Sequence, residues 1–124
     1  MPLNDIHARL FITTLAYCLV MALWAFWRFF RKQGVDSSYW GALVIAEVLL
    51  VIQGALGAYL YFVLGLRPAR ASIHILYGVI SLLSIPGAYA FTKGGDQHRD
   101  MLVYGAVLAF QCGIILRAAV TGGF

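Results

Sequence analysis

The sequence predicts an all-α integral membrane protein in which four transmembrane helices form an up-down-up-down bundle. Composition excludes a soluble globule: the 124 residues are 62% hydrophobic and 11% charged, whereas soluble domains have about 25% charged residues. Four apolar runs each approach the roughly 20 residues that cross about 30 Å of hydrocarbon. The segments between the runs are short, which makes consecutive helices antiparallel neighbours. We therefore expect one domain, residues 1–124, in a lipid bilayer.

The expected helices follow from the apolar runs and from the polar residues at their ends. They cover about residues 5–31, 39–66, 70–92 and 99–120. The first run has no charged residue between Leu10 and Trp27, and the second is interrupted only by Glu47. The third is interrupted only by His74, and Arg117 shortens the apolar core of the fourth.

The net charge of +4 falls in short clusters at the ends of the apolar runs. This distribution is typical of membrane-flanking anchors and excludes the basic stripe of a nucleic-acid-binding protein. One membrane face would carry five basic residues, namely Arg28, Arg31, Lys32, Lys93 and Arg99, and the other Arg9, Arg67, Arg70 and Arg117. We expect a multi-pass protein of the cell inner (plasma) membrane. Because the face with more basic residues stays on the cytoplasmic side, both termini are expected on the outer side. We expect no cleaved signal peptide.

Two histidines are expected at the same depth near the outer surface. His7 lies near the start of the first helix and His74 one turn into the third. Neighbouring helices about 8–10 Å apart would place the first and third on a diagonal of roughly 12–14 Å, which suits a porphyrin. Imidazoles from opposite sides can ligate one haem iron. His7 and His74 are therefore the predicted axial ligands of one b-type haem.

The helix face that follows each histidine is small near the middle of the helix. Four, seven and eleven positions after each histidine stand Phe11, Thr14 and Cys18 in the first helix, and Gly78, Ser81 and Ile85 in the third. These stripes leave space for a flat ligand between the backbones. Arg67 and Arg70 precede His74 and are expected to pair with the two haem propionates.

Each of these residues also has a plainer interpretation. His7 can be solvated by lipid headgroups, and Arg67 and Arg70 can be snorkelling anchors. His74 is harder to dismiss, because an ionisable residue inside a transmembrane run is costly and functional by default. Zinc or copper is disfavoured because no carboxylate or thiol joins the pair at ligand spacing. His98, at the opposite surface, is interpreted as a solvated loop residue.

Glu47 is the only acidic residue within the apolar runs. A carboxylate facing lipid is costly, so Glu47 is expected to be neutral, hydrogen-bonded and directed into the bundle. The alternative is a place in a proton or quinone path. The residues expected to share its inward stripe are Val51, Gly54 and Ala58. The polar residues expected to form interhelical hydrogen bonds are Gln53 and Gln111.

Three short motifs stand on the second, third and fourth expected helices. They are Gln53-Gly54-Ala55-Leu56-Gly57-Ala58, His74, and Gln111-Cys112-Gly113-Ile114. Together with His7 they resemble one four-helix half of the haem A synthase family, over residues 6 to about 120. Each half in that family carries a histidine on its first and third helices. The resemblance thus implies a haem between His7 and His74.

The sequence departs from the family next to the first histidine. The family's enzymes carry a glutamate three residues before it and an arginine directly after it. Here Asn4 and Ala8 hold those positions, with Asp5 and Arg9 adjacent. The loop cysteine pair of some members is absent as well. The resemblance therefore favours haem binding over oxidation of a haem O methyl group.

The expected function is electron transfer by a haem-binding membrane protein with a redox partner or a larger membrane complex. Two alternatives stay open. The chain can be a small accessory subunit of a respiratory or photosynthetic complex, because it has little surface outside the apolar runs. It can also be a half-sized haem A synthase, in which Asp5 stands in for the family's glutamate.

Overall fold

The computed structural model describes residues 3–65, 68 and 70–122, and these residues fold into four helices. The helices are α1 (Leu3–Phe30), α2 (Ser37–Phe62), α3 (Ala71–Thr92) and α4 (His98–Gly122). All four are long and apolar enough to cross a membrane. The all-helical prediction with four candidate membrane spans is therefore confirmed.

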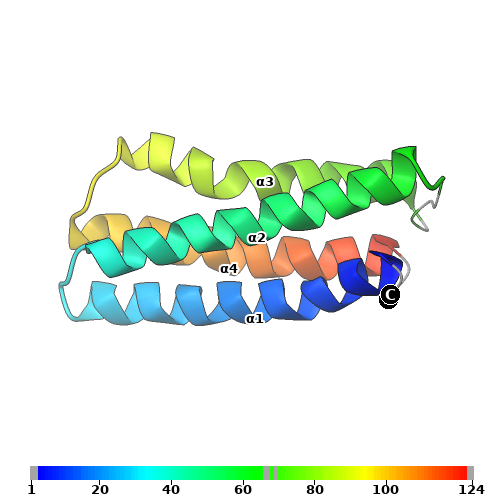
Figure 1. The fold of residues 1–124 in the computed structure, drawn as a ribbon. Coiled ribbons are helices and arrows are strands. Elements are labelled where there is room, and N and C mark those ends of the chain that lie inside the picture. Colours follow the sequence, from blue (N-terminus) through cyan, green and yellow to red (C-terminus); the bar gives the residue numbers. More distant parts are fainter. Residues whose placement is uncertain (1–2, 66–67, 69, 123–124) are drawn as a thin grey trace.

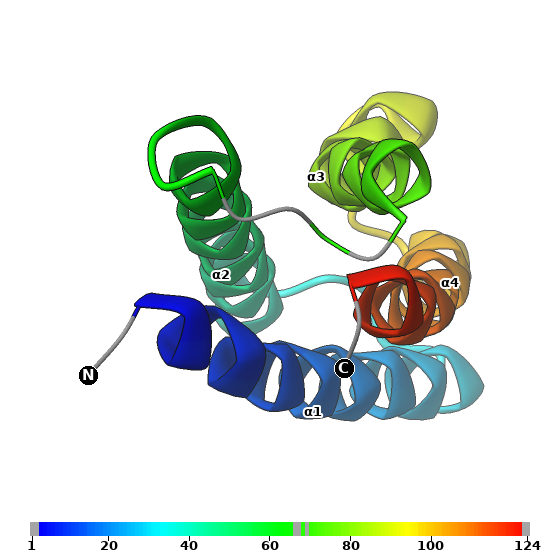
Figure 2. The ribbon, with the colours of Figure 1, turned by 90° about the vertical axis from the view of Figure 1, so that its right-hand side faces the viewer.

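The four helices form a bundle in which α4 lies between α1 and α3 (Figure 2). Helix α4 packs most closely on α1 and α3, whereas α2 packs less closely on α1 and least on α3. Among the described residues, the backbones of α1 and α3 do not approach each other closely. These two helices therefore face each other across the diagonal that the sequence predicted.

The molecule has two different ends. The connections from α1 to α2 and from α3 to α4 lie at one end, which we term the loop end (Figure 1). There the Val35 amide donates to the Asp96 carbonyl oxygen at 2.8 Å. At the other end, which we term the histidine end, α1 and α3 begin and α4 finishes. There the Arg70 amide donates to the Thr121 carbonyl oxygen at 2.8 Å.

The tightly packed core lies toward the loop end. Its fully buried side chains include Cys18, Ala25, Tyr39, Ala46, Met101, Tyr104 and Leu108. The Tyr39 hydroxyl donates to the Met21 carbonyl oxygen at 2.9 Å, and the Tyr17 hydroxyl donates to that of Ala42 at 2.8 Å. The first bond satisfies the hydroxyl of Tyr39, which is fully buried. Both bonds hold α1 and α2 together at this end.

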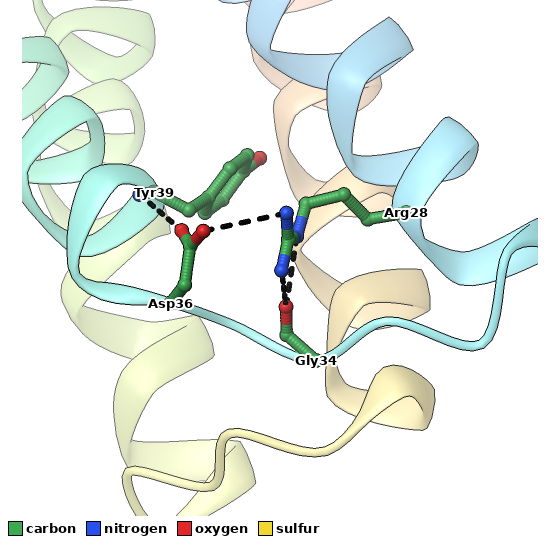
Figure 3. A network of polar contacts seen from close by, with 4 residues as sticks. All are labelled: Arg28, Gly34, Asp36 and Tyr39. Carbon is green, nitrogen blue, oxygen red and sulfur yellow. Dashed lines mark hydrogen bonds and ion pairs between the residues drawn. The ribbon is translucent and has the colours of Figure 1, made fainter.

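A polar network fixes the turn into α2 (Figure 3). The Arg28 guanidinium donates to the Gly34 carbonyl oxygen from Nε at 2.8 Å and lies 3.4 Å from the Asp36 carboxylate. The other Asp36 oxygen accepts from the Tyr39 amide at 2.9 Å. Asp36 thus caps the N-terminus of α2, where unpaired amides need an acceptor. Arg28, the first residue of the basic cluster, is a structural residue here.

The second helix ends earlier than the sequence suggested. We expected it to reach residue 66, but α2 ends at Phe62. The Val63 and Leu64 amides both donate to the Tyr59 carbonyl oxygen, at 2.9 and 3.2 Å. Gly65 then adopts a φ of 70°, a left-handed conformation that glycine takes without steric cost. Apolar composition alone carries no signal for this break, because Val63 and Leu64 suit a helix interior.

Candidate functional site

The rings of His7 and His74 meet across the bundle diagonal. Their centres lie 6.4 Å apart and their planes are inclined by 71°. A coordinating imidazole nitrogen lies about 2 Å from its metal and roughly 1 Å from its own ring centre, so two opposed ligands have ring centres about 6 Å apart. The observed separation matches this value. The structure brings together the two residues that the sequence singled out.

His74 is oriented by the last turn of α4. Its Nδ1 lies 2.7 Å from the Ala118 carbonyl oxygen and 3.3 Å from Thr121 Oγ1. A carbonyl oxygen only accepts hydrogen bonds, so Nδ1 carries the proton. The other nitrogen, Nε2, then keeps its lone pair in the neutral ring. A hydrogen bond from one nitrogen to a backbone carbonyl is the usual way in which proteins orient a metal-binding histidine.

His7 is half-buried and lies against the backbone of α2. A side chain at Gly57 would bring its Cβ to 3.2 Å from His7 Cε1 and 3.7 Å from Nε2. Glycine at this position therefore leaves the room that the ring occupies. The Gln53 side chain donates from Nε2 to the His7 carbonyl oxygen at 2.9 Å, which ties α2 to the first turns of α1. The prediction of an interhelical role for Gln53 is confirmed.

A cavity of about 500 Å³ opens beside the two histidines. Its size falls within the range of small-molecule and cofactor sites, about 300–1,000 Å³. Most residues of the predicted stripes line it, with His7, Phe11 and Thr14 from α1 and His74, Gly78 and Ser81 from α3. The last residue of each stripe, Cys18 and Ile85, lies in the hydrophobic core instead. Helix α2 contributes Gln53, Gly54 and Gly57, and α4 contributes Ile114, Ile115, Ala118 and Ala119. A flat, mostly apolar ligand matches this lining.

The inner wall of the cavity includes a polar atom without a protein partner. Thr14 is only 2% exposed and lines the cavity, and its hydroxyl has no hydrogen-bond partner among the described residues. Buried polar atoms are rarely left unpaired in folded proteins. Occupancy of the cavity by water or by a ligand would explain the Thr14 hydroxyl.

The two predicted propionate partners are placed differently from the histidines. Arg67 lies outside the described residues. Arg70 is exposed and does not line the cavity as described. The Arg70 carbonyl oxygen accepts from the His74 amide at 2.9 Å, which is the first hydrogen bond of α3. Arg70 therefore stands directly before the first turn of α3. The structure does not bring the Arg70 side chain to the histidines.

Two imidazoles that face each other match the protein ligands of a bis-histidine haem. A haem needs only axial ligands, because the porphyrin supplies the other four nitrogens. The spacing of His7 and His74 and the cavity beside them meet that requirement.

The other sequence predictions have mixed outcomes. Gln111 is fully buried and donates from Nε2 to the Ser81 carbonyl oxygen at 2.7 Å, which confirms its interhelical role. Glu47 is half-buried, and its Oε1 is buried without a partner in the described chain. Its predicted stripe is wrong in part, because Val51 is 52% exposed. His98 is exposed, with its ring centre 6.0 Å from that of Phe29 at the loop end.

The face of α2 that points inward is rotated from the predicted one. Its buried residues are Tyr39, Leu43, Ala46, Leu50 and Leu60. These positions follow helical periodicity, but Glu47 stands at their edge. The physical reason is that α2 packs more closely on α1 than on α3. The predicted inward stripe of α2, which includes Val51 and Ala58, therefore lies partly outside the contact between α2 and the other helices.

Several residues of the site carry no sequence signal. Ala118 acts through its backbone carbonyl, which every residue possesses, and Thr121 acts from a helix end. Gly57 appeared as part of a motif but not as the contact of His7. Asp5 also lines the cavity, and the sequence had already singled it out as the stand-in for the family's glutamate. Ala118 and Thr121 had no such signal.

Comparison with known proteins gives no relative. No family model matches the chain, and neither a curated protein nor a solved structure is similar to it. The geometry of the site therefore carries the functional argument.

Proposed function

We propose that this chain is a multi-pass membrane protein that binds one haem b between His7 and His74 and transfers electrons. The observation that carries the proposal is the 6.4 Å separation of two imidazole centres from opposite helices beside a cavity of about 500 Å³. His74 would bind iron through Nε2, since Nδ1 is engaged by Ala118. His7 would be the second axial ligand, with its ring against Gly57.

Membrane insertion is supported by the outer surface of the bundle. Large apolar side chains point outward on three helices, with Phe30, Phe62 and Phe91 exposed by 78, 76 and 77%. An apolar surface of this extent is costly in water and suits lipid. We infer an up-down-up-down crossing of the inner (plasma) membrane, with both termini outside. The denser basic cluster after α1 would then face inward.

Bound haem would supply a one-electron iron couple, and the protein's own residues would tune and insulate it. The apolar walls from α2 and α4 would exclude water, which lowers the local dielectric and holds the ligands in place. From the sequence we assign the propionate contacts to Arg67 and Arg70. Arg70 is exposed at the histidine end, directly before α3, but its side chain does not line the cavity as described.

Haem content in histidine variants tests the proposal. The full chain and its variants His7→Ala, His74→Ala and His98→Ala would be expressed with a haem supply and purified in mild detergent. We expect about one haem per chain in the parent and in His98→Ala, because His98 lies at the loop end. The other two variants should lose haem or bind it weakly. Equal haem content in all four proteins would contradict the assignment.

A second candidate function rests on Asp5. This carboxylate lines the same cavity as His7, where the resembling haem A synthases carry a glutamate close to the histidine. We propose as the alternative that the chain oxidises a haem O methyl group to a formyl group at this site, with water supplying the oxygen and four electrons passing to an external electron acceptor. Co-expression with a source of haem O, followed by pigment extraction, tests it. Absence of haem A above background would exclude the alternative while leaving haem b binding intact.

An accessory role in a respiratory or photosynthetic complex is compatible with either activity. The exposed apolar side chains of α2 and α3, such as Phe62 and Leu83, suit another helix as well as lipid. Native gels of mildly solubilised membranes test this proposal. A species of the mass of one chain plus detergent would count against a larger assembly.

A further inference from the structure

The last turn of α4 makes three polar contacts with the first turn of α3. The Arg70 amide donates to the Thr121 carbonyl oxygen at 2.8 Å. His74 Nδ1 lies 2.7 Å from the Ala118 carbonyl oxygen and 3.3 Å from Thr121 Oγ1. The final carbonyls of a helix lack intrahelical donors. The Thr121 carbonyl is one of these, and the Arg70 amide satisfies it. The Ala118 carbonyl is a second acceptor at the same helix end, for the His74 ring.

The Thr121 hydroxyl has a defined direction. Its oxygen lies 3.0 Å from the Arg117 carbonyl oxygen and 3.2 Å from that of Ala118. One hydroxyl has one proton, which goes to a carbonyl of its own helix, so its lone pairs are left for the imidazole N–H. Thr121 is 5% exposed, so water does not compete for this contact. The His74 N–H is therefore shared between a strong and a weaker acceptor.

We propose that the Ala118 carbonyl and the Thr121 hydroxyl form a positioning element that fixes the Nδ1–H tautomer of His74 and aims its Nε2 at His7. This inference rests on the proposed haem site but concerns a property of the protein without ligand. An acceptor at Nδ1–H increases the basicity of Nε2 as a ligand. The negative end of the α4 dipole adds to the effect. Both favour the ferric form of a bound iron and lower its midpoint potential.

The tautomer is measurable without haem. Nitrogen NMR of the full chain in detergent, with ¹⁵N-labelled histidine and assigned through His74→Ala, distinguishes a protonated Nδ1 from a protonated Nε2 in the neutral ring. We expect His74 to be the Nδ1–H tautomer, whereas free histidine prefers Nε2–H. An Nε2–H signal for His74 would overturn the proposal whether or not the protein binds haem.

The role of Thr121 is measured in the haem-loaded protein. Thr121→Val keeps the shape but removes the hydroxyl, and we expect it to weaken haem binding about tenfold, at the lower end of the effect of outer-shell partners. Its midpoint potential should rise. Thr121→Ser should restore both values, and Thr13→Val, which removes an exposed hydroxyl of α1, should change neither.

The outcomes separate this inference from the proposed function. Unchanged affinity and potential in Thr121→Val would overturn the assignment of Thr121. A parent that binds no haem but shows the Nδ1–H tautomer would leave the positioning element intact and refute the haem proposal. A parent that binds haem, but whose His74 is the Nε2–H tautomer before haem is added, would support the haem proposal and refute the positioning element.

Discussion

Replacing Gly57 by alanine should weaken haem binding while leaving the protein without ligand at least as stable. The added Cβ would lie 3.2 Å from His7 Cε1, which is tighter than nine in ten contacts of this kind. The ring must therefore retreat by a few tenths of an ångström. The Cβ would also stand 3.7 Å from Nε2, an ordinary contact distance. The strain is thus confined to one ring carbon.

The size of the effect follows from packing energetics. Overpacking by one methyl group costs about 1–3 kcal/mol, and we take the lower limit because a ring can tilt. The cost appears as weaker haem binding, because bound iron would hold the His7 ring in place against the added methyl group. A cost of about 1 kcal/mol corresponds to a roughly fivefold weaker affinity. Alanine in place of glycine inside a helix instead stabilises by about 1 kcal/mol.

Haemin titration of the detergent-solubilised protein measures the affinity, and thermal unfolding without haem measures the stability. Gly113→Ala is the matched control, since it lies inside α4 and an added Cβ meets nothing within 4 Å. Both variants should gain helix stability, and Gly57→Ala alone should lose affinity. Equal haem affinity for the two variants and the parent would refute the placement of His7 beside Gly57 in the loaded protein.

Three further substitutions, one with a matched control, test the loop end and the role of Glu47. Gly34→Ala should destabilise the protein by about 1–3 kcal/mol in thermal unfolding, because the added Cβ would collide with the Asp96 carbonyl oxygen. Gly41→Ala is the control and should not destabilise the protein, because its added Cβ meets nothing within 4 Å. Asp36→Ala should cost about 1 kcal/mol in the same assay through loss of the α2 cap. Glu47→Gln should keep folding and haem content, and loss of electron transfer with haem retained would place Glu47 in a proton path.

The local part of the fold could be predicted from sequence because it depends on helical periodicity. The step from His7 to Phe11 and Thr14 is a property of any helix, and both residues line the cavity as expected. The pairing of His7 with His74 followed from the order of the apolar runs. The distance of 6.4 Å between their rings agrees with that inference.

The contacts between helices could not be predicted from the sequence, because they depend on how each helix is rotated about its axis and where it ends. The exposure of Val51 reflects the closer packing of α2 on α1, which no periodicity within α2 encodes. The contact of His74 with the Ala118 carbonyl joins positions far apart in sequence. Because its acceptor is a backbone atom, residue identity gives no warning of it. The same holds for the Asp96 carbonyl that receives the Val35 amide.

The most direct test of the central claim is the absorption spectrum of the purified full chain after addition of one equivalent of haemin and reduction with dithionite. Two histidines on one iron predict a six-coordinate, low-spin spectrum with a sharp alpha band, saturating at one haem per chain and unchanged by carbon monoxide. His74→Ala should lose that band, and His98→Ala should keep it. A parent spectrum that lacks the alpha band, or that shifts on exposure to carbon monoxide as a single-histidine haem does, would contradict the bis-histidine site.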